Sequence, residues 1–219
     1  MKQVALSAIL CLLALTAWTA EKDIDAKRFP SPDKKLEYRI KDGGGAEIVK
    51  VKTGEVVLEL KEAAETALAT DTGTVLWAPD SRRFAFNYRA GGRYYTCRVY
   101  ELAGSEWKGL PDFETNAKAV TEALTRCERK SVKELGLPKG AYRRRINDTW
   151  KVHRWIDVDT LEVLAYSEGS YVVKKKEEDI ESVGCAILFT AKCDNKGNWK
   201  ILRLREPSAA ELQKLQEGD

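Results

Sequence analysis

Two stretches of alternating apolar and polar residues lie one after the other in the first half of the chain. They run from Leu36 to Ile40 and from Phe84 to Tyr88, and a period of two predicts β-strands with one buried face. Glycines follow each stretch, at 43–45 and at 91–92, and a second alternating stretch comes after them. We therefore predict two antiparallel hairpins. Their apolar positions match in the order Leu36 with Phe84, Tyr38 with Phe86, Ile40 with Tyr88 and Val51 with Val99.

Each hairpin is entered through a Pro-Asp pair, Pro32-Asp33 in the first and Pro79-Asp80 in the second. Proline fixes its own φ and aspartate hydrogen-bonds the backbone that follows, so each pair predicts a turn. The same parts recur at an offset of 47 to 48 residues, and such a repeat of antiparallel strands is typical of β-propeller blades. We predict two blade-like repeats, residues 30–62 and 75–110, within a region 21–110. The alternative is two ordinary hairpins that are alike because every hairpin needs turn residues.

The stretches "SPDKKLEYRI" and "APDSRRFAFNYRAGGRYYTCRVYEL" resemble the Pro-Asp repeat of TolB-like periplasmic β-propellers. In that family a Pro-Asp-Gly-type turn leads into the inner strands of a blade. The resemblance covers roughly residues 30–110, and the glycine expected after the aspartate is Lys34 in one copy and Ser81 in the other. Closed propellers have four to eight blades. The resemblance thus implies blade-like sheets of an incomplete β-propeller.

Helical patterns are expected in two places before residue 140. The alanine- and glutamate-rich stretch Leu60–Ala69 predicts a short helix, and a longer one is predicted from Ala117 to Leu135 within a helical connection over residues 111–140. Asn116 is expected to cap the longer helix and Gly136 to end it. This helix is expected to pack on a sheet, the alternative being a partner-binding helix. Its apolar positions are Val120, Leu124, Cys127 and Leu135.

Residues 141–219 predict a third antiparallel sheet with a short terminal helix opened by a capping box at Ser208–Glu211. The fold class is therefore mainly β with minor α. It consists of antiparallel blade-like sheets resembling an incomplete β-propeller, one amphipathic helix and a C-terminal antiparallel sheet. The expected strands of that sheet are Thr149–Val158, Leu161–Tyr166, Ser182–Cys193 and Trp199–Leu204.

The first twenty residues have the pattern of a secretory signal peptide. Lys2 precedes an apolar run from Val4 to Ala17, and small residues follow. The run of about 14 residues is shorter than the roughly 20 that span a bilayer, so a retained membrane anchor is the weaker alternative. Cleavage is expected after Ala17 or Ala20. We expect an exported mature chain, periplasmic or extracellular, with no transmembrane segment.

The charge balance excludes a general attraction to nucleic acid. The chain has 37 basic and 34 acidic residues, a net charge of +3. Four cysteines, Cys97, Cys127, Cys185 and Cys193, permit two disulfides in an oxidising compartment, the alternative being reduced thiols. Cys185 and Cys193 lie on one predicted strand, about 26 Å apart at 3.3 Å per residue, so each would pair with Cys97 or Cys127. No closely spaced Cys/His pair predicts a metal site.

No catalytic constellation is visible in the sequence. His153 is the only histidine, and on a predicted strand it is expected to be an ordinary surface or half-buried residue. The nucleophile, phosphate-loop and metalloprotease motifs are absent. Asp33 and Asp80 are interpreted as turn residues. We predict no catalytic residue, no cofactor and no metal, and the alternative is a polysaccharide- or peptide-acting hydrolase with dispersed carboxylates.

Two groups of residues are candidates for binding. Tyr94 and Tyr95 follow a glycine turn, so one of them must point away from the core, and with Arg89 and Arg93 they are expected to form a rim that stacks on a sugar or contacts a protein. The second group is an arginine run, which we interpret as a solvated loop or, as a binding candidate, as a contact for an acidic envelope polymer or a lipid headgroup. It comprises Arg143, Arg144 and Arg145, with Lys139 and Arg154 near them.

The sequence therefore predicts an exported, non-catalytic binding or scaffold protein of the periplasm or cell envelope, whose ligand it does not name. The expected partners are an envelope protein or polymer, or a second copy of the chain paired through open sheet edges, and not nucleic acid.

Overall fold

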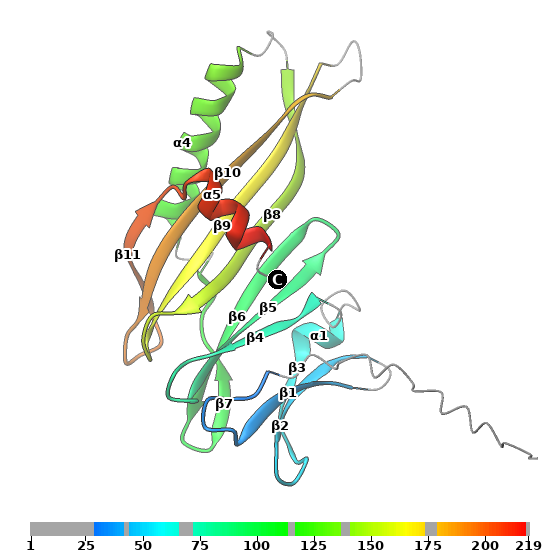
Figure 1. Ribbon diagram of the computed structural model, residues 1–219, viewed down its shortest axis with the longest axis vertical. Helices are drawn as coiled ribbons and strands as arrows, with labels where there is room; N and C mark the ends of the chain where they lie inside the picture. Colours follow the sequence, from blue (N-terminus) through cyan, green and yellow to red (C-terminus); the bar gives the residue numbers. More distant parts are fainter. Residues whose placement is uncertain are drawn as a thin grey trace, which may run out of the picture.

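The computed structural model of the chain is mainly β, as the sequence predicts (Figure 1). In the part of the chain that it describes there are two sheets and three helices. The predicted signal peptide, Asn116 and Lys139 lie outside the described residues. The described residues are 29–41, 44–65, 72–113, 117–136, 141–173 and 179–217.

The first module, residues 29–65, forms a three-stranded antiparallel sheet in the order β1-β2-β3. Its return strand begins at Ala46, because Gly44 and Gly45, with φ of +102° and +89°, close a short loop directly after β1. Val51 consequently lies in the following turn and is exposed. The elements are β1 (Leu36–Ile40), β2 (Ala46–Lys50), β3 (Val56–Leu60) and α1 (Lys61–Glu65).

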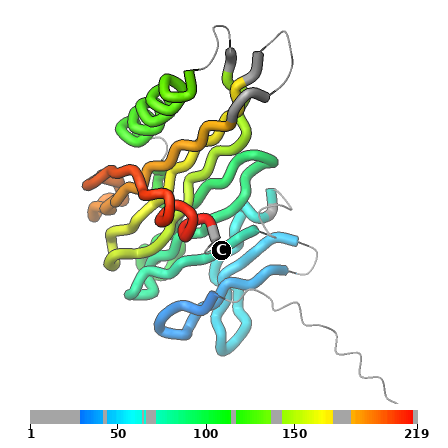
Figure 2. Tube along the Cα trace, turned by 45° about the horizontal axis from the view of Figure 1, so that its top comes forward, coloured from blue at the N-terminus to red at the C-terminus, as the bar shows by residue number. Residues whose placement is uncertain are grey.

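The second module, residues 72–113, is a four-stranded antiparallel meander that belongs to a larger sheet of eight strands (Figure 2). The sheet has the order β11-β10-β9-β8-β6-β5-β4, with β7 paired to β6 beside this path. The strands of the second module are β4 (Thr74–Trp77), β5 (Arg83–Gly91), β6 (Tyr94–Ala103) and β7 (Glu106–Gly109).

The C-terminal strands, predicted as a separate third sheet, continue the sheet of the second module. The junction is a short parallel pairing of β6 with β8, in which Tyr94 faces Asp148 and Tyr95 faces Thr149. All four C-terminal strands are also longer than predicted, and the arginine run, for which a solvated loop was one interpretation, lies inside β8. The elements are β8 (Ala141–Trp155), β9 (Thr160–Val173), β10 (Asp179–Cys193), β11 (Trp199–Arg205) and α5 (Ala209–Glu217).

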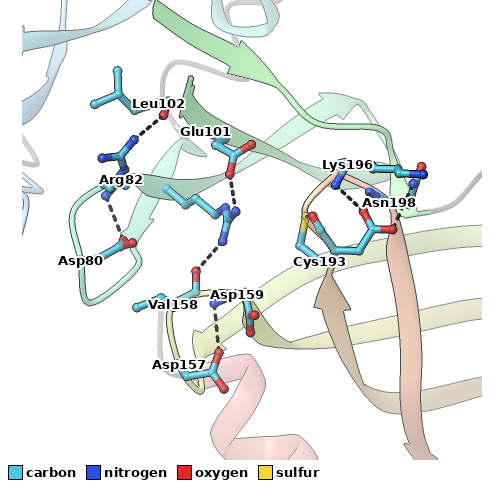
Figure 3. A network of polar contacts seen from close by, with 12 residues as sticks. Asp80, Arg82, Glu101, Leu102, Asp157, Val158, Asp159, Cys193, Lys196 and Asn198 are labelled. Atoms are coloured by element: carbon cyan, nitrogen blue, oxygen red, sulfur yellow. Dashed lines mark hydrogen bonds and ion pairs between the residues drawn. The ribbon is translucent and has the colours of Figure 1, made fainter. Parts of the chain in front are cut away.

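The two Pro-Asp corners have the same backbone conformation. Asp33 and Asp80 each accept a hydrogen bond from the amide two residues further on, at 3.1 and 3.0 Å, the latter drawn in Figure 3. Lys34 and Ser81 have φ of +56° and +61°, the left-handed region that favours glycine. These are the positions at which the TolB-like repeat has glycine. The corner geometry is therefore kept although the glycine is not.

The corners define an offset of 47 residues between the modules, and this corrects the predicted side-chain alignment. The amide of Ser31 bonds Leu36 O, and the amide of Ala78 bonds Arg83 O, so Arg83 rather than Phe84 is the equivalent of Leu36. Likewise the bridge between Pro30 and Glu37 corresponds to the pair of Trp77 with Phe84. The alternation itself was predicted correctly, but a shift of one residue reverses which face of a strand a side chain occupies.

The modules consequently pack face to back: the strand face that carries Tyr38 in the first module meets the opposite strand face of the second module. Tyr38 of the first module meets Phe86 of the second, with ring centroids 6.0 Å apart. The true equivalent of Tyr38 is Ala85, which points the other way and joins a second core with Val152 of β8. The same face of each module thus looks towards the next unit along the chain, and the C-terminal sheet takes the place of a further blade.

Two helices cover opposite faces of the C-terminal sheet. α4 (Lys118–Leu135) packs Val120 and Ala123 against the face that carries Val163, whereas Leu215 of α5 packs against Leu164 on the other face. α4 ends at Gly136, as predicted, with φ of +59°. Two expectations for this helix were wrong. Its N-cap is Ala117, whose side chain makes no capping bond, and Leu135 is exposed.

Candidate functional site

Some members of the two groups of residues predicted to bind ligands meet at one place. The tip of the β5–β6 hairpin lies beside β8, where the amide of Asp148 donates to Arg93 O at 3.0 Å. The guanidinium of Arg93 in turn donates to Arg145 O at 3.1 Å. The Arg145 guanidinium lies over the ring of Tyr94, 5.6 Å from its centroid. Residues some 50 positions apart in the sequence therefore form one surface, which includes an open depression of about 600 Å³.

Most of the predicted arginines already bind groups of the chain itself. Arg145 pairs with Asp148 at 2.6 Å, and Arg143 pairs with Glu128 of α4 at 2.6 Å. Arg89 donates to the backbone oxygens of its own glycine loop and lies over the ring of Tyr95, 5.5 Å from its centroid. The ion pairs of Arg143 and Arg145 explain how β8 carries an arginine run as a strand, since both of these cations are neutralised locally.

Arg144 lies on the face of β8 opposite to Arg143 and Arg145. Tyr94 is half-buried and packs against the main core, and Tyr95 is also half-buried. The predicted rim of Arg89, Arg93, Tyr94 and Tyr95 is therefore divided between two places. Tyr94 and Arg93 line the open depression, while Tyr95 lines a separate, deeper cleft.

This cleft lies between β4 and β5 on one side and β8 on the other, at the end of α5. Its inner part, which we call the apolar chamber, has a volume of about 370 Å³. It is lined by Thr74, Asn87, Lys151 and His153 and by six apolar side chains. These six come from four elements and from the start of the described chain. The six are Phe29, Val75, Leu76, Val152, Leu164 and Leu215.

The outer part of the cleft, the polar chamber, has a volume of about 390 Å³ and is lined by hydroxyl and amide groups. It shares Thr74, Asn87 and Lys151 with the apolar chamber, so the two chambers adjoin at these residues. No carboxylate lines either chamber among the residues that the structure describes. The further lining residues are Thr72, Tyr88, Tyr95, Thr96, Asn147, Thr149 and Gln216.

Asn87 fixes the width of the cleft. Its side-chain amide donates to Val152 O at 2.9 Å and accepts from Val152 N–H at 2.9 Å, so it pairs with β8 as a strand backbone would. Asn87 is 3% exposed. A second link lies three residues further along β8, where the indole of Trp155 donates to Leu76 O at 2.9 Å. These two links hold β8 at a fixed distance from β4 and β5 of the second module.

The corner end of the second module is also tied to the C-terminal strands. Arg83 forms an ion pair with Glu101 of β6 and donates to Val158 O at 3.0 Å, in the turn between β8 and β9 (Figure 3). The turn after β10 is closed around Asp194, whose carboxylate accepts from the amides of Lys196 and Asn198 at 2.8 Å each. The contacts of Arg83 thus join β5 and β6 to the turn between β8 and β9.

Sequence reasoning missed the cleft residues Asn87 and Lys151. Asn87 follows Phe86 on an alternating strand, which by itself indicates a solvent-facing polar residue. Its partner Val152 lies 65 residues away in the sequence, so no local pattern predicts the contact. Lys151 shares its face of β8 with Asn147 and Thr149, a spacing of two that a strand of any function has.

Among the described residues, the lining of the cleft contains one histidine and no carboxylate or thiol. His153 is exposed at the edge of the apolar chamber, and no carboxylate or thiol lines that chamber beside it. No cluster of three or more His, Cys, Asp or Glu residues suited to a metal ion occurs in the described part of the chain. No helix in that part is long and apolar enough to cross a bilayer.

The four cysteines hold free thiols in this structure. Cys127 of α4 packs against Cys185 of β10, so of the pairings left open by the sequence this contact favours Cys127 with Cys185. Burial, together with a hydrogen bond to Cys127, raises the pKa of Cys185 to about 12. Burial likewise raises the pKa of Cys193 to about 11. Both thiols are therefore protonated and unreactive at neutral pH.

Comparison with known proteins gives structural matches only. Neither a protein-family model nor the sequence of a curated protein matches the chain. Among solved structures, the chain is similar to TolB from Acinetobacter baumannii, with a TM-score of 0.31 and 9% identity over 82% of this chain, and it spans 40% of the TolB chain. It is also similar to the Cps50 (Swd1) beta-propeller domain from Myceliophteria thermophila, with a TM-score of 0.23 and 8% identity over 84% of this chain and 72% of that one. The blade-like description of this chain rests on its own corners and packing.

Proposed function

We propose that the protein is exported to the periplasm or cell envelope and works there by binding, without catalysis. The leader-like residues 1–20 support export. The observation that carries the binding role is the cleft between the second module and β8, which has apolar, hydroxyl and amide groups on its walls and no carboxylate among the described residues. Paired acids are what the alternative, a glycoside- or peptide-cleaving enzyme, would need there.

The cleft has the composition of a recognition site. Small-molecule sites are concave, mostly apolar, of about 300–1,000 Å³, with a few fixed polar groups that set orientation. Here Asn87 is held by Val152, so its position does not depend on a ligand. The open depression around Arg93, Tyr94 and Arg145 is a second surface, and its shallow shape suits contact with an envelope protein or polymer.

The proposal is tested by expressing the full chain in a bacterium and recovering it from the periplasm. An N-terminus following Ala17 or Ala20 is expected, and a chain retained in the cytoplasm with Met1 intact contradicts export. The purified protein is then incubated with solubilised envelope and with purified peptidoglycan. Capture of an envelope component without turnover is expected, and hydrolysis of peptidoglycan contradicts the non-catalytic role.

A matched pair of variants assigns the binding surface. Thr74→Trp places a large side chain where the two chambers adjoin, whereas Arg93→Ala removes a contact of the open depression. Loss of capture with the first variant alone places the ligand in the cleft, and loss with the second alone places it at the depression. Light scattering on the same samples tests self-association through sheet edges. Lys200 and Arg203 on the edge strand β11 oppose such pairing, so a monomer is expected.

A further inference from the structure

We propose that the cleft binds an extended peptide segment of a partner protein, which adds to the open edge of β4 as one more strand. Apolar side chains at every second position of this segment occupy the apolar chamber. This inference rests on the proposed binding function and names the partner class of that site.

β4 has an open edge, because it is the last strand of the eight-stranded sheet and pairs only with β5 among the strands that the structure describes. The amide of Ala78 donates to Arg83 O at 2.8 Å, and opposed residues of an antiparallel pair alternate between hydrogen-bonded and non-hydrogen-bonded. Leu76 is therefore bonded to Ala85, whereas the N–H and C=O of Val75 point away from β5. β4 thus offers a backbone donor and acceptor to a further strand.

The apolar chamber lies along this edge. Val75 belongs to the core that joins the two modules, while Thr74 and Leu76, its neighbours on the strand, point to the opposite face of β4. All three residues line the chamber, which places this space at the edge of the strand and not over one face. A segment that enters the chamber therefore lies beside β4, where strands are spaced by about 4.8 Å.

The chamber has a fixed wall on each side of the open edge. Phe29 forms the wall on the side of the first module, and the indole of Trp77 holds it by donating to Phe29 O at 2.9 Å. Leu164 of β9 and Leu215 of α5, which belong to one core, form the wall on the other side. A single segment fits between these walls, whereas a second copy of the chain would have to bring a whole sheet between them.

The residue types of β4 also distinguish it from the edge strand at the other end of the sheet. β11 carries Lys200, Arg203 and Arg205, and charges on an edge strand oppose pairing. β4, with the sequence TVLW, has neither a charge nor a proline. Its edge is therefore not protected against strand addition by its own side chains.

A peptide is the occupant that uses all features of this cleft. In strand addition, main-chain hydrogen bonds give the affinity and pockets for alternate side chains give the specificity. An alkyl chain has no group to pair with the backbone of Val75, and a sugar has no apolar side chains to place between Phe29 and Leu215.

The first test is selection of a phage-displayed library of random heptapeptides on the immobilised protein. Enriched peptides are expected to carry apolar residues at alternate positions and to lose binding to the Thr74→Trp variant. Absence of enrichment over the bare support overturns the proposal. Enriched peptides that bind Thr74→Trp as well as the unaltered protein overturn it too.

A second test addresses the backbone. The most enriched peptide is synthesised in two further forms, which carry one N-methyl group on one or the other of two neighbouring central residues. Because successive N–H groups of a strand point to opposite sides, only one of the two groups replaces a donor that faces β4. That form is expected to bind about tenfold more weakly by fluorescence anisotropy, and the other form is expected to bind as the parent peptide does. Equal affinity of the two forms overturns strand addition.

A third test makes the same change in the protein. Val75→Pro removes the N–H that points away from β5, and the ladder of β4 with β5 does not use this group. We expect this variant to bind the peptide about tenfold more weakly. Val75→Ala, which shortens the same side chain and keeps the N–H, is the matched control and is expected to lose less affinity. Equal losses in two variants with unchanged near-UV circular dichroism overturn the role of this N–H, and if Val75→Pro does not fold, the N-methylated peptides decide.

Failure of this inference is distinguishable from failure of the proposed function. If no peptide is enriched while envelope components are still captured in the assay above, this inference fails and the binding function stands. Peptide binding that Arg93→Ala abolishes and Thr74→Trp leaves intact belongs to the open depression, which likewise overturns this inference alone. A dimer in light scattering that Thr74→Trp dissociates assigns the edge of β4 to a second copy of the chain and overturns the proposed partner.

Discussion

In the first module the side chains of Tyr38 and Ile40 face the second module. In the second module the equivalent positions, Ala85 and Asn87, face away from the first module and towards the C-terminal sheet. The backbone plan is shared, since both modules turn through the same corner at an offset of 47 residues. The residue types differ because each position meets a different neighbour.

Alignment of the two modules by residue type alone pairs residues that are not structurally equivalent. An alignment by residue type pairs Tyr38 with Phe86, because both are large and apolar. They are large because they fill the same core from opposite sides, with centroids 6.0 Å apart, and not because they occupy equivalent positions. Equivalent positions of packed repeats face different partners whenever the packing is face to back.

The largest effect is expected for Phe86→Ala. Phe86 is fully buried between the modules, and truncation removes its contacts with Tyr38 and Tyr88, at a cost of about 3–5 kcal/mol in the free energy of unfolding. Urea unfolding followed by tryptophan fluorescence measures this. The control is Arg39→Lys, at the equivalent position of the first module, where the side chain is 46% exposed and the positive charge beside the buried Glu47 is retained, so a smaller loss is expected. Equal losses contradict the face-to-back arrangement.

Asn87→Ile is expected to cost about 2–4 kcal/mol, because it leaves both the amide and the carbonyl of Val152 without a partner. The substitution introduces the residue that the first module has at this position, Ile40. If the two modules were interchangeable, the variant would be tolerated. Urea unfolding is again the measurement, with Asn198→Ala in the exposed turn after β10 as control, for which a change below about 1 kcal/mol is expected.

Tyr38→Phe is expected to stabilise the protein by up to about 1 kcal/mol at neutral pH, because the buried Tyr38 hydroxyl has no hydrogen-bond partner. The gain should grow in alkali. Burial raises the pKa of Tyr38 to about 12 from 10.0, so between these pH values the folded state holds a proton that the unfolded state releases, and stability falls as pH rises. The Tyr38→Phe variant has no hydroxyl at this position and therefore does not lose stability in this way. Urea unfolding at pH 7, 9 and 11 measures the difference, and a constant difference contradicts it.

The smallest effects concern the corners. Lys34→Gly is expected to stabilise by about 0.5–1 kcal/mol, because glycine adopts the left-handed conformation without strain. Ser81→Gly relieves the same strain but also removes the hydroxyl that accepts the Asp33 amide at 3.1 Å, so a net change near zero is expected. Thermal unfolding of the two variants side by side measures the contrast. Equal stabilisation by both contradicts a role of Ser81 in joining the modules.

Alternation, the corners and the C-terminal end of α4 were predictable from the sequence because each depends on residues close together in the chain. β1, β11, the Asp194–Asn198 turn and the end of α4 at Gly136 all follow from local patterns. The arginine run was misassigned for the opposite reason. A loop and a strand with three arginines look the same locally, and only Glu128, Ser167 and Asp148, which lie on other elements or beyond the bulge of β8, make the strand stable.

The candidate site was predictable only in pieces. Tyr94 and Arg145 were each predicted to bind a ligand. Their contact depends on the parallel pairing of β6 with β8, which the sequence of neither strand predicts. The cleft was not predicted at all, because its walls are brought together by Asn87 and Trp155 through contacts 65 and 79 residues apart in the chain.

By itself the sequence determined which segments become strands, where the two corners turn and that the fold is mainly β, since hydrogen bonding and side-chain alternation within a few residues are enough for that. The tertiary structure alone decided which face of each strand became core, that the second module and the C-terminal strands share one sheet, and that a cleft opens beside Lys151. The physical reason is that these features come from packing between segments far apart in the chain, whose free energy depends on shape and burial and not on any local pattern.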